Sequence, residues 1–159
     1  MDVKLVNPFV DATLHVLETI SSTKANPGKP FLKKDQKAAG DVTAVIGLTG
    51  EASGTISVSF TESCILSIVS KMFGEEMTSV NNEIQDAVGE ISNMISGQAR
   101  QKLETLGRTL KAAIPTVITG KGHSITHITK YPIIAIPFET DKGSFNIEIC
   151  IETSNGKKG

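Results

Sequence analysis

The longest regular pattern of apolar and polar positions runs from residue 82 to residue 106. Its apolar positions follow one another at steps of three and four: Ile84, Val88, Ile91, Ile95, Ala99, Leu103 and Leu106. This spacing predicts a helix of roughly 36 Å whose single apolar stripe faces the core. Asn82 with Gln85 resembles a capping box at the start of this helix, and Gly107 follows as its stop.

Two other segments have helical spacing. Asn7 and Pro8 suit the N-cap and the first position of a helix. The apolar positions behind them are Phe9, Val10, Leu14, Val16, Leu17 and Ile20. Residues 62–73 show the same period, and Gly74 supplies their C-terminal stop. We therefore expect a long, largely buried helix near the N-terminus and a shorter one in the middle of the chain.

The period changes to two in the segments expected to form strands. Ile56, Val58 and Phe60 alternate with Thr55, Ser57 and Ser59, behind an apolar run at 42–48 and a turn at 50–54. This pattern predicts a hairpin with one apolar face and one face that is wet or meets something polar. A strand is also expected at 116–120, behind Pro115. A second hairpin is expected from 134–138 and 145–151, around the turn at 141–143.

The connecting segments complete the outline. Residues 26–30 contain two prolines and a glycine and predict a loop, and the lysines at 29, 33, 34 and 37 suit a solvated loop or an edge strand. Residues 1–153 are expected to form a single domain, followed by a disordered tail at 154–159. The order of elements predicts an α+β fold, a layered helix/sheet sandwich with mainly antiparallel strands and two long helices.

Composition narrows the classes of function. The 159-residue chain carries 16 Lys and Arg against 17 Asp and Glu, and this balance disfavours nucleic acid as a partner. No leader is evident, and no apolar run approaches the ~20 residues that span a bilayer. We expect a soluble cytoplasmic protein with no membrane partner. Cys64 and Cys150 are expected to be reduced thiols in or near the core.

A second ridge of the predicted long helix is polar. Stepping from Asp86 by four and three gives Glu90, Asn93, Gly97 and Arg100, and these positions share nothing with the apolar stripe. Gly97 continues the ridge and Gly89 adjoins Glu90, although each glycine costs a helix about 1 kcal/mol relative to alanine. A solvated helix surface would explain the polar residues. It would not explain the two glycines, which allow another backbone to approach closely.

The chemistry open to this ridge is narrow. No Asp, His or Cys cluster nearby predicts a metal site, and no serine or cysteine has an obvious base. Phosphoryl transfer depends mainly on positioning and electrostatics, so a helper protein needs little more than a charge and a group that holds water. An Asn amide can accept a hydrogen bond from a water molecule and donate another elsewhere.

The arrangement Asp86-x3-Glu90-x2-Asn93, with Pro115 further along, resembles the motif of the CheC/CheX/FliY phosphatases of bacterial chemotaxis. The opening NPFVDATLHVLETI, the length and the order of helices and hairpins are similar to the CheX members in particular. The resemblance thus covers nearly the whole chain.

This resemblance implies an α/β fold, a homodimer formed through the sheets, and a helix that docks into the active site of a phosphorylated CheY-type response regulator. Asn93 would orient the attacking water and Glu90 would pair with a lysine of CheY. Asp86, Gly89 and Gly97 would contact the partner, the glycines by giving clearance. The aspartyl phosphate and Mg²⁺ would belong to the partner, so no cofactor is expected on this chain.

Other motifs in the chain offer alternative interpretations. Asp11, His15 and Glu18 occupy the same spacing in the first helix but lack both functional residue types, so one site per chain is expected. His123 and His127 could form a metal pair, but a loop or surface position suits them better. TGKGHS lacks the spacing of a phosphate-binding loop. A docking module that binds a response regulator or flagellar switch component without hydrolysis is the main alternative function.

Overall fold

The computed structural model describes residues 3–35, 37–127 and 131–152. The helices in these ranges are α1 (Val3–Ser21), α2 (Glu62–Phe73) and α3 (Asn82–Thr105). The strands are β1 (Asn26–Pro27), β2 (Phe31–Lys33), β3 (Val42–Gly50), β4 (Gly54–Phe60), β5 (Leu110–Ala112), β6 (Thr116–Thr119), β7 (Ile133–Thr140) and β8 (Gly143–Ile151). The tail expected at 154–159 lies outside the described residues.

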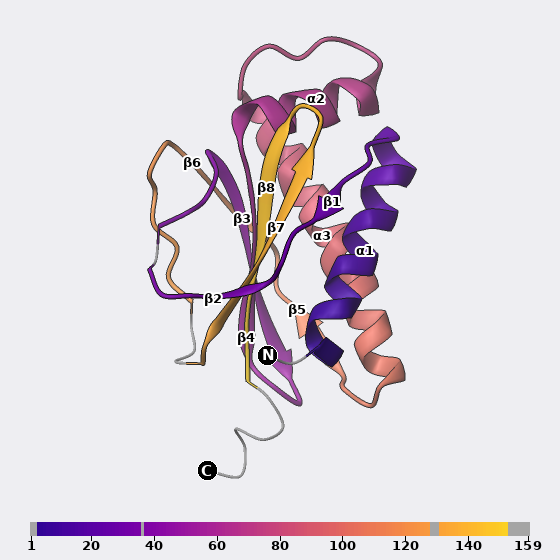
Figure 1. Ribbon diagram of the computed structural model, residues 1–159, viewed down its shortest axis with the longest axis vertical. Helices are drawn as coiled ribbons and strands as arrows, with labels where there is room; N and C mark the ends of the chain where they lie inside the picture. The colour runs from indigo at the N-terminus through magenta and orange to yellow at the C-terminus, as the bar shows by residue number, and fades with distance from the viewer. Residues whose placement is uncertain (1–2, 36, 128–130, 153–159) are drawn as a thin grey trace.

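All strands belong to one antiparallel sheet (Figure 1). The order is β1-β7-β8-β4-β3-β5, with β2 also pairing with β7 and β6 also pairing with β3. Both predicted hairpins, β3–β4 and β7–β8, are confirmed, and β4 pairs with β8 to join them. The predicted α+β class is therefore confirmed.

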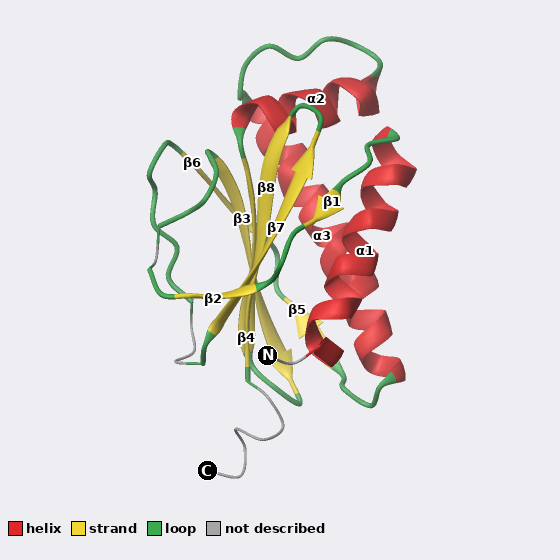
Figure 2. Ribbon diagram, viewed as in Figure 1, coloured by secondary structure: helices red, strands yellow, loops and turns green. Residues whose placement is uncertain are grey.

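The helices cover one face of the sheet, and α1 and α3 lie side by side there (Figure 2). The core lies between these two layers, because the apolar positions of the alternating strands face the helices. Ile56, Val58 and Phe60 are each at most 1% exposed, as are Ile91 and Ile95 of α3. Burying side chains of this size contributes about 1.5–3 kcal/mol each. This packing holds α3 rigidly against the sheet.

The opposite face of the sheet is polar and covered. Thr55, Ser57 and Ser59 are buried although their side chains alternate away from the helices. Their cover includes the segment 120–127, whose His123 and His127 hydrogen-bond to threonines of β3 and β4. The expectation that this face meets something polar is confirmed.

The first helix begins earlier than predicted. It starts at Val3 and contains Pro8, so Asn7 is not its N-cap. Leu5 and Val6 are buried in the core, and their burial outweighs the one backbone hydrogen bond that Pro8 cannot donate. The helix thus extends through a residue that local preference would place at its start.

Other boundaries of the predicted elements also differ. The N-cap of α3 is Asn81, whose side chain accepts a hydrogen bond from the backbone N–H of Ile84, so the capping box at Asn82 is wrong by one residue. Leu106 follows the end of α3 and is 57% exposed rather than in the core. Strand β1 lies within the predicted loop and β5 was not predicted, because two or three residues show no measurable period.

Candidate functional site

The α3 ridge, by which we mean Asp86, Glu90 and Asn93, lies on the exposed side of α3. The residues between them that continue the apolar stripe, Val88 and Ile91, are fully buried. Helical spacing alone puts these two sets on different faces, since residues three and four apart are neighbours. The predicted outward orientation of the ridge is confirmed.

An open hollow of about 360 Å³ adjoins the α3 ridge. One wall consists of the ridge itself with Gly89, and the other comes from the connection between β5 and β6 and the start of β6. That second wall includes Ile114, Pro115 and Val117. The fold therefore brings Pro115, the last residue of the sequence motif, next to the ridge. Sequence reasoning gave Pro115 a place in the motif but did not identify Ile114 or Val117 as neighbours of the site.

The polar side chains of the α3 ridge have no internal partners. Across residues 3–35, 37–127 and 131–152, the side chains of Asp86, Glu90 and Asn93 form no hydrogen bond or ion pair. All three are exposed. Their donors and acceptors are therefore available to another molecule, at no cost of breaking contacts within the protein.

The glycines beside the ridge are not required by the packing of the chain. A Cβ added at Gly89 would meet a Val117 methyl group at 3.6 Å, an ordinary van der Waals distance. At Gly97 it would meet only the Arg100 guanidinium, at 3.9 Å. Alanine would fit both positions and favour the helix, so neither glycine is explained by contacts among the described residues.

Arg100 ends the polar ridge with a structural contact. Its Nη1 donates to the carbonyl of Leu110 in β5 and its Nε to Ser96 Oγ, both at 3.4 Å. The guanidinium thus links α3 to the edge of the sheet. Arg100 is half-buried, and its Nε and Nη1 donate within the fold.

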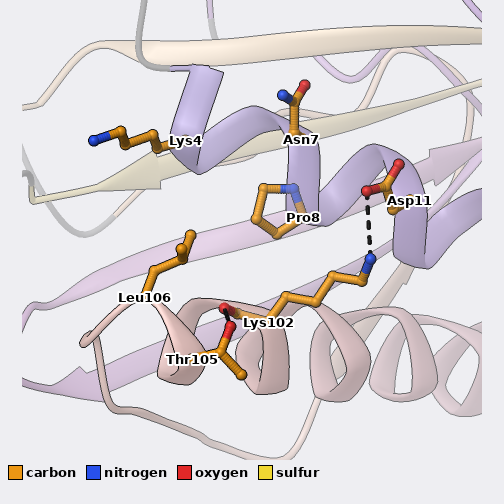
Figure 3. A pocket seen from close by; sticks show the side chains of 7 residues that line it. All are labelled: Lys4, Asn7, Pro8, Asp11, Lys102, Thr105 and Leu106. Atoms are coloured by element: carbon orange, nitrogen blue, oxygen red, sulfur yellow. Dashed lines mark hydrogen bonds and ion pairs between the residues drawn. The ribbon is translucent and has the colours of Figure 1, made fainter.

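Two of the three matching positions of α1, Asp11 and His15, contact α3. Asp11 Oδ2 accepts from Lys102 Nζ at 3.3 Å, and His15 Nδ1 lies 3.0 Å from Gln98 Oε1. Figure 3 shows this ion pair at the rim of another hollow, of about 370 Å³, between the start of α1 and the end of α3. Its lining includes Asn7, Pro8 and Leu106 but neither Glu90 nor Asn93. The carboxylate in this hollow, Asp11, is already paired with Lys102, unlike the carboxylates of the α3 ridge.

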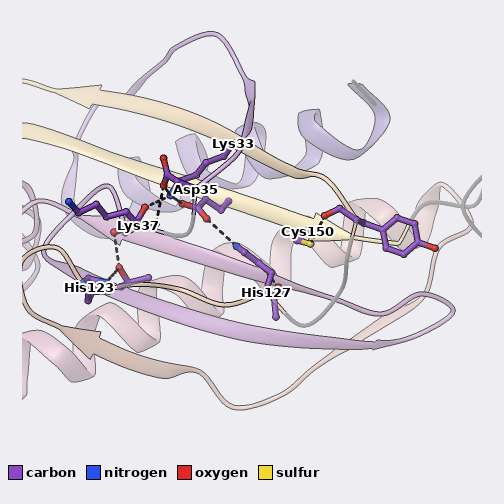
Figure 4. Close-up of polar contacts among 11 residues, drawn as sticks. Lys33, Asp35, Lys37, His123, His127 and Cys150 are labelled. Atoms are coloured by element: carbon purple, nitrogen blue, oxygen red, sulfur yellow. Dashed lines mark hydrogen bonds and ion pairs between the residues drawn. The ribbon is translucent and has the colours of Figure 1, made fainter.

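His123 and His127 belong to the covered face of the sheet and do not form a pair (Figure 4). His123 Nε2 lies 2.6 Å from Thr43 Oγ1. The side chain of His127 is 3% exposed, hydrogen-bonds to Thr55 and lies 3.0 Å from Glu148 Oε1. His127 thus lies in a segment without regular structure, as predicted, but its side chain is not at the surface, because it is buried against Thr55 and Glu148.

Glu148 is the centre of this arrangement. Lys33 Nζ lies 2.5 Å from Glu148 Oε2. Lys33 belongs to the edge strand β2, one of the two predicted settings, but its side chain is only 9% exposed and is therefore not solvated. We refer to Lys33, Thr55, His127 and Glu148 as the Glu148 cluster. Burial by itself would raise the pKa of Glu148, but hydrogen bonds and charges from His127 and Lys33 outweigh it and hold the pKa below its ordinary value.

The remaining reactive groups do not suggest a second site. Cys64 and Cys150 are buried, as predicted, and burial raises the pKa of Cys64 to about 11, so its thiol stays protonated. In the part of the chain that the structure describes, no three His, Cys, Asp or Glu residues form a group able to hold a metal. Among the same residues, no helix has the length and apolar character to cross a membrane.

Comparison with known proteins agrees with this geometry. The family model for the chemotaxis phosphatase CheX matches residues 42–139, which include the α3 ridge and both walls of its hollow. The CheY-P phosphatase CheX of Thermotoga maritima is 30% identical over 137 residues, covering 84% of this chain and 88% of that protein.

Solved structures give the same result. The chemotaxis protein CheX of Desulfovibrio desulfuricans is 48% identical with a TM-score of 0.87, covering 93% of this chain and 99% of that chain. The CheX–CheY–BeF3–Mg²⁺ complex of Borrelia burgdorferi is 25% identical with a TM-score of 0.78, covering 92% of this chain and 96% of that chain. This chain belongs to the chemotaxis phosphatase CheX family.

Proposed function

We propose that this protein accelerates hydrolysis of the aspartyl phosphate on a CheY-type response regulator, and that Asn93 and Glu90 carry the activity. The observation behind the assignment of these two residues is the α3 ridge. It presents an amide and two carboxylates without internal partners, on a rigid helix beside an open hollow, in a chain whose relatives act on phosphorylated CheY.

Asn93 would position the attacking water. Its carboxamide oxygen accepts a hydrogen bond from the water, which aligns the water oxygen with the phosphorus atom. As the new P–O bond forms, the bond between phosphorus and the aspartyl oxygen breaks. The products are inorganic phosphate and the free aspartate of the partner. The protons of the attacking water leave on the inorganic phosphate, and the amide neither gains nor loses a proton. Because water is the nucleophile, the chain needs none of its own.

Glu90 and Asp86 would hold the partner. The two exposed carboxylates suit a cationic side chain beside the phosphorylated aspartate, and the resemblance identifies this side chain as a lysine of the regulator. Gly89 and Gly97 would leave room for the partner's backbone along α3. Mg²⁺ would be held by the regulator, as it accompanies CheY and BeF3 in the Borrelia complex. The proposal places both proteins in the cytoplasm.

A homodimer is part of the proposal and rests on the family resemblance. Phe31 and Leu32 of the short strand β2 are 44% and 53% exposed, and exposed apolar residues on a sheet edge favour association with another chain. Light scattering at several protein concentrations tests this. A single species with the mass of one chain, 16.9 kDa, would remove the dimer from the proposal.

The function is tested by following the decay of radiolabelled acyl phosphate on candidate response regulators. We expect the wild-type protein to accelerate decay of at least one regulator at substoichiometric concentration. Acceleration of none, together with binding to the BeF3-activated form of one, would favour the docking module that hydrolyses nothing.

A further inference from the structure

The second wall of the hollow carries the most exposed large apolar side chain of the residues described. Ile114 is 90% exposed, whereas the other large apolar residues at the surface are between 44% and 57% exposed. It precedes Pro115, and both line the hollow beside Asn93. An isoleucine in this setting lowers solubility and contributes almost nothing to the core, so its position calls for an explanation outside the monomer.

The pairing of the sheet edge explains how Ile114 comes to project. Strand β5 pairs with β3 through Ala112 and Leu48, and β6 pairs with β3 through Thr116 and Val45. Between these two pairs β3 has two residues, 46 and 47, whereas the other strand has three, 113 to 115. The extra residue is a β-bulge, a feature that commonly redirects a side chain next to a functional site.

The backbone around the bulge supports this geometry. Ala113 N–H donates to the carbonyl of Gly47 at 2.9 Å, which fixes the chain just before Ile114. Pro115 has no N–H to offer β3 and a fixed φ, so pairing resumes only at Thr116. Ile114 is therefore held away from the sheet by ordered neighbours on both sides.

The location of Ile114 identifies what it would meet. A regulator whose phosphorylated aspartate reaches Asn93 must also cover the hollow, and Ile114 lies on the opposite wall of that same hollow. An interface of this kind combines a polar group at the chemistry with an apolar anchor beside it. A second hollow, lined partly by Ile118 and Thr116, also reaches Ile114.

We propose that Ile114 is an apolar anchor that docks the response regulator, inserting between apolar side chains next to the regulator's phosphorylation site. This inference rests on the proposed function. Ile114 is then a positioning residue that sets affinity, whereas the α3 ridge sets the rate of the chemical step. The bulge and Pro115 serve to present it.

The experiment compares Ile114→Ser with two controls, Leu106→Ser at an exposed apolar position just after the end of α3 and the conservative Ile114→Leu. Affinity is measured by titrating a regulator loaded with BeF3 and Mg²⁺, and KM and kcat by phosphate release. We expect Ile114→Ser to raise both Kd and KM about tenfold to a hundredfold, with kcat changed by less than about twofold. Leu106→Ser and Ile114→Leu should stay within about threefold of wild type, and all three variants should melt at the wild-type temperature because both positions are exposed.

An unchanged Kd for Ile114→Ser, or an equal rise in Kd for Leu106→Ser, would overturn the inference. A fall in kcat at constant KM would overturn it too, because Ile114 would then act on chemistry rather than docking. Titration of the BeF3-loaded regulator requires no turnover, so Ile114 is tested even if the wild-type protein proves to have no phosphatase activity.

Discussion

The α3 ridge and the Glu148 cluster both place a carboxylate beside other polar side chains, but only the Glu148 cluster forms hydrogen bonds within the protein. Glu148 is 1% exposed and bonds to His127 and Lys33 on the covered face of the sheet. Glu90 and Asn93 are exposed and bond to nothing within the described residues. A buried charge requires a hydrogen-bonding or oppositely charged partner within the protein, whereas an exposed charge without one can bind another molecule. The comparison separates a structural use of polar residues from a functional one.

The largest expected effect is on stability, at the Glu148 cluster. Glu148→Gln removes the nearest negative charge from Lys33. The nearly buried ammonium then keeps the more distant Asp35 Oδ1, at 3.8 Å, and the carbonyl of Lys37. We expect the free energy of unfolding to fall by about 3–5 kcal/mol, measured by urea denaturation. The matched variant Glu90→Gln should change it by less than about 0.5 kcal/mol. Equal losses in the two variants would show that burial does not distinguish the two regions.

The pH dependence of stability should originate in the same cluster. The folded pKa of Glu148 lies below its ordinary value, so its stabilisation is complete above the ordinary carboxyl pKa of 4.5 and is lost as the pH falls through the lower, folded pKa. Urea denaturation of wild type between about pH 6 and about pH 3 should therefore show decreasing stability. Glu148→Gln should decrease less steeply. If the unfolding free energies of wild type and Glu148→Gln fell in parallel with pH, the acid sensitivity would belong to other carboxylates.

Glu90 should affect binding rather than stability. We expect Glu90→Ala to raise KM about tenfold and to weaken the salt dependence of binding, because one attractive charge is lost from the interface. The measurement is phosphate release at two ionic strengths, with Glu83→Ala in the first turn of α3 as a control outside the ridge. If Glu83→Ala raised KM as much as Glu90→Ala, the effect would come from the change in net charge and not from the position of Glu90.

The smallest expected effect concerns the glycines. Gly97→Ala should stabilise the protein by up to about 1 kcal/mol, because the added Cβ meets only the Arg100 guanidinium at 3.9 Å and alanine favours the helix. Gly97→Leu should keep the fold and raise KM. Thermal denaturation and phosphate release measure the two effects. Unchanged activity of Gly97→Leu would mean that the glycine gives no clearance to a partner.

The exposed ridge could be predicted from the sequence because it depends on the period of one helix. The position of Asn93 relative to Ile91 and Ile95 fixes its face, and no tertiary contact overrides that arrangement. The family motif then suggested what the exposed amide does. The same local reasoning located both hairpins, whose strands are close in sequence.

The Glu148 cluster could not be predicted in this way. Its ion pair joins Lys33 in β2 to Glu148 in β8, and His127 reaches Glu148 from a segment without regular structure. The alternation of Thr55 and Ser57 showed that one face of the sheet is polar, but a wet face and a covered polar face have the same pattern. Ile114 projects because of a register change between β5 and β6, and the sequence carries no period that reveals a bulge.

The most direct test of the account is the comparison of Asn93→Ala with wild type in phosphate release and in binding to the BeF3-loaded regulator. We predict that kcat falls about 10²-fold or more, while the Kd for the loaded regulator changes by less than about threefold. A wild-type kcat in Asn93→Ala, or a loss of rate matched by an equal loss of binding, would contradict the claim that this amide positions the attacking water.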